Sequence, residues 1–330
     1  MSFRRLPAFY LVTLAALVVI AVLSLCLGAV RISPCELWSA IRGDVSGSAY
    51  KILRFVRLPR MFAAMLCGAA LASSGAIIQS VLHNSLGSPN VLGMNAGAGL
   101  AVIVCAAVVP FAPKMLPFAA FAGAFVTLLL VCALGNRAGN GRTSVLLAGV
   151  AANAFFLALT DTVTVLVPDT IYSRTAFKIG SLSGVQFSVL VPAAVVIVVS
   201  IVISLLLRHE LDVLALGNES AQSLGLPVNL VRFCALVLAA LLCGAGISFA
   251  GLVGFVGLIV PHCARFFVGI EMRRLLPASI LLGAVLVLLC DLLSRLIFAP
   301  YELPVGILLS IIGGPFFAVL LLKRKRRLYD

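Results

Sequence analysis

The chain has 330 residues, of which 62% are hydrophobic and only 11% are charged. Its mean hydropathy is +1.21. This composition excludes an ordinary soluble globular domain, and despite a formal net charge of +13 we expect no nucleic-acid partner. Apolar runs long enough to cross a hydrocarbon core recur along the whole chain. We therefore predict an all-α, polytopic membrane protein with a single transmembrane domain over residues 1–330.

Ten apolar stretches are predicted to span the membrane. In chain order they cover about 7–29, 61–82, 91–110, 117–135, 145–167, 189–207, 229–249, 251–268, 276–298 and 304–322. The first is expected to be a retained helix, because it is long for a signal peptide and lacks a clear small-residue cleavage site. Ten spans place both termini on one side. The tail Lys323–Arg327 and the early Arg4 and Arg5 predict that this side is cytoplasmic.

The loop between the first two predicted spans runs against this charge bias. Six basic residues lie there on the predicted outer side: Arg31, Arg42, Lys51, Arg54, Arg57 and Arg60. Two interpretations stay open from the residues alone. The loop is either a tolerated exception to a statistical rule or a docking surface for an acidic partner.

The residues that usually carry chemistry are scattered. The nine cysteines contain no C-x-x-C pair and fall mostly inside apolar runs, so neither a disulfide framework nor a metal site is expected. His83, His209 and His262 lie far apart, and the sequence contains no G-x-x-x-x-G-K-[ST] loop. We predict no catalytic site, no metal site and no directly bound cofactor on this chain.

A half-polar segment, LDVLALGNESAQSLGLP, separates the sixth and seventh spans on the predicted cytoplasmic side. It reads as two short helices broken at Gly217, with Gly225 ending the second helix and Pro227 preventing its continuation. Leu211, Leu214, Leu224 and Leu226 are costly to leave in water. They predict either packing against the bundle or a docking surface for a cytoplasmic partner.

Eight motifs, in order, identify a family. They are RLPR (57–60), GAALASSGAIIQ (68–79), LLAGVA (146–151), GSLSG (180–184), LALGNESAQSLGL (214–226), GFVGLIVPHCARF (254–266), LPASILLGA (276–284) and ELPVGILLSIIGGPFFAVLL (302–321). Together they resemble the permease family of iron-chelate, haem and vitamin B12 ABC importers, over about residues 30–322. The resemblance implies ten helices in a vitamin B12 importer permease-like fold and a homodimer in the bacterial or archaeal inner membrane. It also implies two cytoplasmic ATPase subunits, which hold ATP and Mg, and an extracytoplasmic substrate-binding protein.

The resemblance also assigns roles to residues. Residues 212–226 become coupling helices that dock on the ATPase, with Leu216, Gly217, Glu219, Ala221 and Gly225 as the coupling residues. Arg57, Arg60 and Arg295 become docking residues for the binding protein, because arginine binds paired carboxylates well. Arg295 also lies four residues after Asp291, so a purely structural ion pair is an equal alternative.

The expected cytoplasmic gate is formed by Asn84, Leu86, Thr143 and Ser144. The family's R-N-P-L-A-x-P loop reads His83-Asn84-Ser85-Leu86-Gly87-Ser88-Pro89 here, so a proline is lost and a glycine gained. Phe177 stands where the family has tryptophan. Asp161 is expected at an interface or, less favoured, at the outer mouth.

Two other functional classes are weighed. An ion-gradient-driven secondary transporter needs a charged relay near the midplane, whereas the acids here lie mostly in loops or near helix ends. An intramembrane enzyme needs converging catalytic residues, which three scattered histidines do not supply. For the cargo, ferric siderophore is the first expectation, followed by haem, corrinoids and, remotely, oxyanions.

Overall fold

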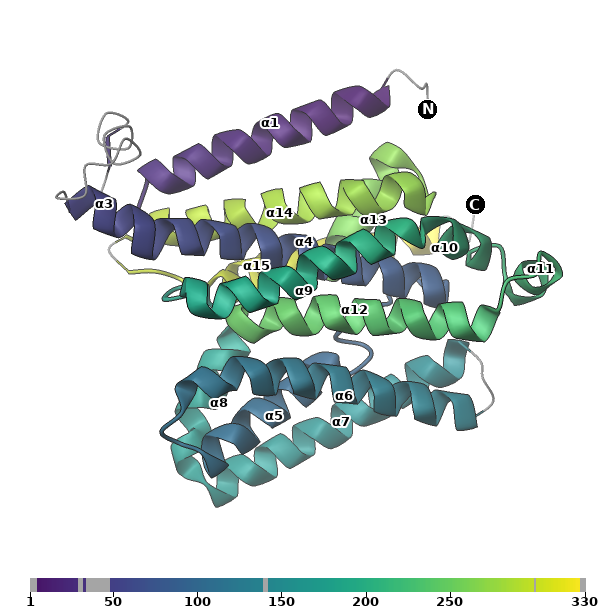
Figure 1. The fold of residues 1–330 in the computed structure, drawn as a ribbon, viewed down its shortest axis with the longest axis horizontal. Coiled ribbons are helices and arrows are strands. Elements are labelled where there is room, and N and C mark those ends of the chain that lie inside the picture. Colours follow the sequence, from purple (N-terminus) through teal and green to yellow (C-terminus); the bar gives the residue numbers. More distant parts are fainter. Residues whose placement is uncertain (1–4, 29–31, 34–47, 139–141, 300, 327–330) are drawn as a thin grey trace.

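The computed structural model describes residues 5–28, 32–33, 48–138, 142–299 and 301–326. All regular secondary structure among these residues is helical. The long helices run roughly side by side, and the N- and C-terminal ends lie on the same side as the short helices α10 and α11 (Figure 1). We call this side the α10–α11 end and the opposite side the α8 end.

The helices have the following bounds: α1 Arg5–Cys26, α3 Ser48–Ile52, the π-helix η1 Leu53–Arg57, α4 Leu58–Leu82, α5 Met94–Val108, η2 Pro113–Met115, α6 Leu116–Arg137, α7 Arg142–Leu166, η3 Pro168–Thr170, α8 Ile171–Ile179, α9 Phe187–Leu206, α10 Arg208–Leu214, α11 Asn218–Ser223, α12 Val228–Ala250, α13 Val256–Val268, α14 Met272–Leu296 and α15 Val305–Arg326. Each of the ten predicted spans corresponds to one apolar helix. Seven are long and apolar enough to cross a membrane. The helices Met94–Val108, Val256–Val268 and Val305–Val319 are shorter apolar helices.

Two helix starts and one additional helix differ from the sequence prediction. The second span does not begin at 61, because α3, η1 and α4 form one helical run from Ser48. The eighth helix begins at Val256 instead of 251, since residues 251–254 are not helical. The short helix α8 was not expected, because it is too short and polar to resemble a span. Much of the basic outer loop, including Arg31 and Arg42, lies outside the described residues.

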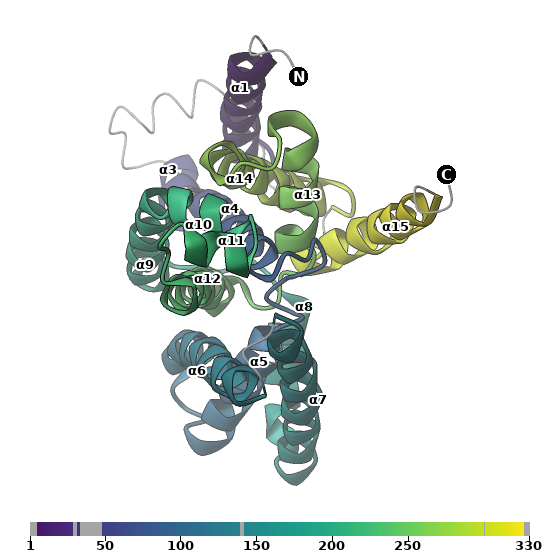
Figure 2. The ribbon, with the colours of Figure 1, turned by 90° about the vertical axis from the view of Figure 1, so that its right-hand side faces the viewer.

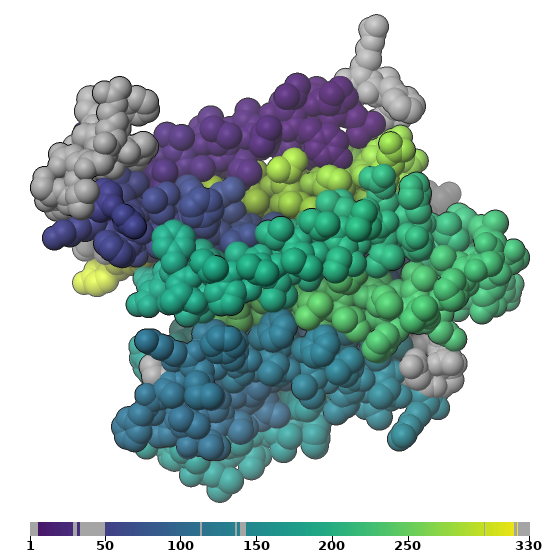
Figure 3. All heavy atoms as spheres, viewed as in Figure 1, coloured from purple at the N-terminus to yellow at the C-terminus, as the bar shows by residue number. Residues whose placement is uncertain are grey.

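Helix α4 is the centre of the fold. It packs most extensively against α14 and α12, and it also contacts α13 and α9. Figure 2, viewed from the α10–α11 end, shows α4 enclosed by these four helices, while α5, α6 and α7 form a neighbouring group and α15 diverges from the bundle. In Figure 3 the atoms of the α10–α11 region form the right-hand edge of the molecule.

Glycines allow α4 to approach its neighbours backbone to backbone. A Cβ atom added at Gly68 would lie 2.1 Å from the Gly283 oxygen of α14, and one added at Gly75 would lie 1.8 Å from the Gly257 oxygen of α13. Small residues at helix contacts are the usual means of tight packing in membranes. At these two positions they leave no space for even a Cβ atom between α4 and the facing helix.

Replacing Gly75 by alanine should therefore force α4 away from α13. Overpacking of this kind costs about 1–3 kcal/mol or more, so the thermal unfolding temperature of the purified protein in detergent should fall by several degrees. The matched control is Gly246→Ala in α12, where the new Cβ would meet its nearest neighbour at an ordinary 3.5 Å. Equal unfolding temperatures for the two variants would contradict the close packing.

Candidate functional site

A buried network of charges lies at the α8 end. Arg60 Nε donates to Asp291 Oδ1 at 2.9 Å, and Arg60 Nη1 donates to Glu302 Oε2 at 2.7 Å. Arg295 Nη2 lies 3.2 Å from the other Asp291 oxygen. Asp291 is fully buried, whereas the Glu302 side chain is partly exposed. Since a buried carboxylate is stable only when its charge is compensated, these arginines hold Asp291 in place.

Arg295 and a further arginine, Arg57, bind the end of α1. Arg295 Nη2 donates to Ser24 Oγ at 2.7 Å, and Arg57 Nη1 donates to the Leu25 carbonyl. The last carbonyls of a helix lack partners within the helix and carry partial negative charge, so they attract guanidinium groups. The three predicted docking residues, Arg57, Arg60 and Arg295, are therefore buried and bound to groups inside the protein.

The predicted gate residues divide between two places. Asn84 and Leu86 line a cavity of about 490 Å³, together with Pro89, Asn95, Leu146 of α7, Phe317 of α15 and the segment before α13. The Asn84 side chain also accepts a hydrogen bond from the Leu86 backbone at 2.9 Å, which fixes the turn. Thr143 and Ser144 do not line this cavity. Ser144 instead donates to the Ala138 carbonyl at 3.1 Å, close to the start of α7.

The backbone that faces this cavity is irregular. Phe255, the N-cap of α13, has a left-handed φ of 65°, and its ring occupies the space beside Gly313 of α15. Non-helical backbone at membrane depth is tolerated where it lines a cavity or lies inside protein. The segment 251–255 meets this condition, and a strained residue beside a cavity is typical of a functional position.

Gln79 of α4 repairs the broken start of α13. The Gly257 carbonyl would normally accept a hydrogen bond from residue 261, but that residue is proline and has no N–H. Gln79 Nε2 takes its place, donating to the Gly257 oxygen at 3.2 Å. The Gln79 side-chain oxygen in turn accepts a hydrogen bond from Arg265. This role of Gln79 was not predicted from the sequence, although Pro261 within an apolar stretch was the available signal.

The half-polar segment forms two short helices that are fixed to the bundle. Leu211, Leu214 and Ala221 are buried, whereas Leu216 and Leu224 are 64% and 66% exposed. Helix α11 ends in a Schellman motif: the Leu226 and Gly225 amides donate to the Ala221 and Gln222 carbonyls, and Gly225 has a φ of +80°. The predicted packing against the bundle therefore holds for Leu211 and Leu214, whereas a docking surface at the exposed leucines stays a prediction.

Three side-chain hydrogen bonds tie this unit to separate parts of the chain. Asp212 accepts from the Met272 amide at 2.6 Å and so caps α14, while Arg232 of α12 donates to Asn218 at 2.7 Å. His83 is the C-cap residue of α4, and its Nε2 lies 2.9 Å from the Ala215 carbonyl oxygen. Because His83 also begins the gate loop, the α10–α11 unit touches that loop directly.

A second cavity, of about 860 Å³, lies at the α8 end between α7, α8 and α15. Arg174 lines it and forms an ion pair with the exposed Asp161, which does not line it. Phe177 is half-buried, and its carbonyl accepts from the Leu252 amide at 2.8 Å. The residue that departs from the family pattern thus joins α8 to the irregular segment before α13 through its backbone.

The chain is similar to known permeases over nearly its whole length. The sequence pattern of the FecCD transport family matches residues 16–323, nearly the whole chain. The chain belongs to the FecCD transport family. Its curated FecCD relatives include the Fe(3+)-citrate import system permease protein YfmE of Bacillus subtilis (strain 168), 36% identical over 96% of both chains. Another is the hemin transport system permease protein HmuU of Yersinia pestis, 36% identical over 95% of both chains.

A solved structure confirms the fold expected for a FecCD chain. A metal-chelate type ABC transporter in an inward-facing conformation superposes with a TM-score of 0.86 and 28% sequence identity, covering 96% of this chain and 99% of the other. The all-α permease fold predicted from the sequence is therefore confirmed. The roles assigned to single residues stay predictions.

Asp291→Asn should destabilise the protein strongly, because it leaves two buried guanidinium groups without their shared carboxylate. Breaking a buried pair costs about 3–5 kcal/mol, which should appear as a large drop in unfolding temperature in detergent or as loss of expression. Asp161→Asn is the control, since it breaks an exposed ion pair that contributes about 0–1 kcal/mol. Comparable stability of the two variants would show that the network does not support the fold.

Gln79→Leu should lower stability by about 1–3 kcal/mol, because it leaves the Gly257 carbonyl without a donor. Pro261→Ala supplies the missing amide, so the same Gln79→Leu change should cost clearly less in that background. The measurement is a double-mutant cycle on thermal unfolding in detergent. Additive effects would rule out the proposed replacement of the proline amide by Gln79.

Proposed function

We propose that this chain is the membrane-spanning subunit of an ABC importer that moves a metal chelate inward by alternating access. Two copies form the translocation unit, and two ATPase subunits bind at the α10–α11 end, which is cytoplasmic together with both termini. A binding protein delivers the cargo at the α8 end. Family membership and the permease names of the relatives support the importer role. The iron-citrate, hemin and ferric enterobactin names of relatives support a metal chelate as the cargo.

The observation that carries this proposal is the α10–α11 unit. It presents Leu216, Glu219 and Leu224 outward while its inner face is fixed to α14, α12 and the gate loop. Exposed leucines on a rigid, bonded element favour a protein partner. Motion of an ATPase at this surface would pass to the bundle as a rigid-body shift. Gly217 and Gly225 have φ of +114° and +80°, so they set the shape of the unit, while buried Ala221 holds it against the bundle.

The proposed gate keeps Asn84 and Leu86 at its centre, because both line the cavity that meets the His83 loop. Thr143 and Ser144 would take part as the start of α7, whose Leu146 lines the same cavity.

In the dimer, the exposed apolar faces of α7 and α15 are the proposed subunit contact. Leu147, Val150, Ile311 and Val319 are among the exposed residues on them.

Docking of the binding protein is proposed over the segment that carries Arg57 and Arg60, with Arg295 beside it. Those three arginines would have to release their present partners before they could bind an outside carboxylate. Lys51 and Arg54 lie on the same helical run and are exposed. We therefore extend the proposed docking surface to these two residues.

Replacing Leu216 and Leu224 together by aspartate should prevent assembly with the ATPase. Burying a leucine contributes about 1.5–3 kcal/mol, so losing two should weaken binding roughly a hundredfold or more. The measurement is co-purification of the ATPase with the tagged chain and its affinity in nanodiscs. Phe298→Asp, at an exposed position of the α8 end, is the control. Normal ATPase binding by the double variant would overturn the proposed role of this unit.

A further inference from the structure

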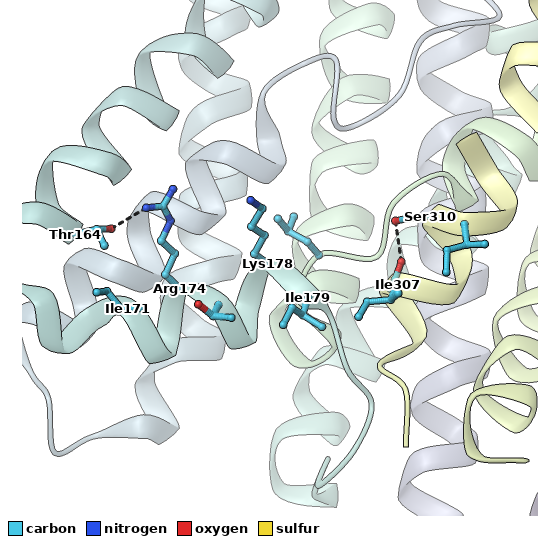
Figure 4. Close-up of a pocket in the computed structure, with 11 residues that line it drawn as sticks. Thr164, Ile171, Arg174, Lys178, Ile179, Ile307 and Ser310 are labelled. Atoms are coloured by element: carbon cyan, nitrogen blue, oxygen red, sulfur yellow. Dashed lines mark hydrogen bonds between the residues drawn. The ribbon is translucent and has the colours of Figure 1, made fainter. Parts of the chain in front are cut away.

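The cavity at the α8 end has a chemical character of its own. It is lined by Thr164 of α7, by Ile171, Arg174, Thr175, Lys178 and Ile179 of α8, by Leu252, and by Gly306, Ile307, Ser310 and Ile311 of α15. Its volume of about 860 Å³ lies in the range of small-molecule sites. Figure 4 shows the Arg174 guanidinium and the Lys178 ammonium extending from the same side of α8.

Both ionisable residues in this lining are cations. Arg174 and Lys178 are four residues apart on α8 and therefore share one face of the helix. Arg174 is held by exposed Asp161 and by Thr164 Oγ1, which lies 3.4 Å from its Nη1. Lys178 has no ion-pair or hydrogen-bond partner among the described residues. No aspartate or glutamate lines the cavity. The net charge of the lining residues is thus positive. Asp161, which lies outside the lining, compensates only part of it.

The wall that presents these cations is fixed in place. The Leu252 amide donates to the Phe177 carbonyl at 2.8 Å, and the Gly306 amide donates to the Gly180 carbonyl at 3.1 Å. Alanine at Gly180 or Gly306 would collide with backbone oxygens at 2.3 Å and 2.2 Å. Helix α8, the segment before α13 and the start of α15 therefore meet without space to shift. A preorganised site loses little free energy when it binds its ligand.

We propose that this cavity, which we name the α8 pocket, binds metal chelates that carry several carboxylate groups. Arg174 and Lys178 attract the anionic groups, while Thr164, Thr175 and Ser310 supply hydroxyl donors. The pocket thereby favours polycarboxylate chelates over uncharged ones of similar size, such as ferric trihydroxamates. This selectivity rests on the proposed importer function, but the charge of the pocket can be measured without transport.

The first measurement reports the electrostatic potential inside the pocket. Thr175→Cys is introduced into a full-length chain whose native cysteines are replaced, and the chain is placed in nanodiscs. The rates of modification by a negatively charged and a positively charged methanethiosulfonate reagent are then compared. The ratio of anionic to cationic rates should exceed that at Ser188→Cys, an exposed position at the same end.

Removing the lysine charge should lower this ratio. Lys178→Gln is expected to reduce it on the order of three- to tenfold, as one unit charge a few ångströms away would. Lys114→Gln, which removes an exposed lysine at the same end outside the pocket, should leave the ratio unchanged. A ratio at Thr175→Cys equal to that at Ser188→Cys, or equal effects of the two lysine changes, would overturn the proposal.

The second measurement uses ligands. Ferric citrate should slow modification of Thr175→Cys in a concentration-dependent way, and the protection should be lost in the Arg174→Gln/Lys178→Gln variant. A ferric trihydroxamate at the same concentration should protect much less. Equal protection by the two chelates, or protection that survives the double substitution, would contradict the selectivity. Neither assay needs ATP or a partner subunit, so failure of the pocket and failure of the importer function are separate results.

Discussion

The direct backbone contact of α4 with α13 and α14 is the constraint on which the rest of the structure depends. At Gly68 and Gly75 the facing oxygens leave no room for a Cβ atom. Helices packed this closely cannot slide or separate in small steps, because packed interiors do not deform continuously. Helix α4 therefore makes one unit with these neighbours, and any conformational change has to take place around it. The elements left for that change are α15 and the α5–α8 group, which would move together where they meet the segment before α13.

The elements at the two ends of the molecule are connected through contacts between named residues. The α10–α11 unit meets His83, His83 begins the gate loop, and Asn84 and Leu86 share a cavity with the segment before α13. That segment reaches α8 through the Leu252 amide, and α8 lines the pocket at the opposite end. The two ends of the molecule are thus joined by a contiguous set of contacts.

Sequence reasoning predicted the features that depend on local pattern. Run length and apolar composition gave the ten helices, the breaks at Gly217 and Gly225 gave the two short helices, and the four-residue spacing gave the Asp291–Arg295 pair. It could not predict pairs brought together by the fold. Arg60 and Asp291 are 231 residues apart, so nothing in the sequence indicated that Arg60 is buried against this carboxylate. The left-handed Phe255 and the Gln79 contact likewise depend on how α4, α13 and α15 pack.

The most direct test of the importer account is uptake by vesicles that contain this chain, its partner ATPase and its binding protein. Radioactive iron, supplied as ferric citrate or as haem, is measured inside the vesicles with and without ATP on the ATPase side. The account predicts accumulation that requires ATP hydrolysis and all three components, and that is unaffected when proton and sodium gradients are collapsed. Accumulation driven by an ion gradient in the absence of ATP would contradict it, since the chain would then be a secondary transporter.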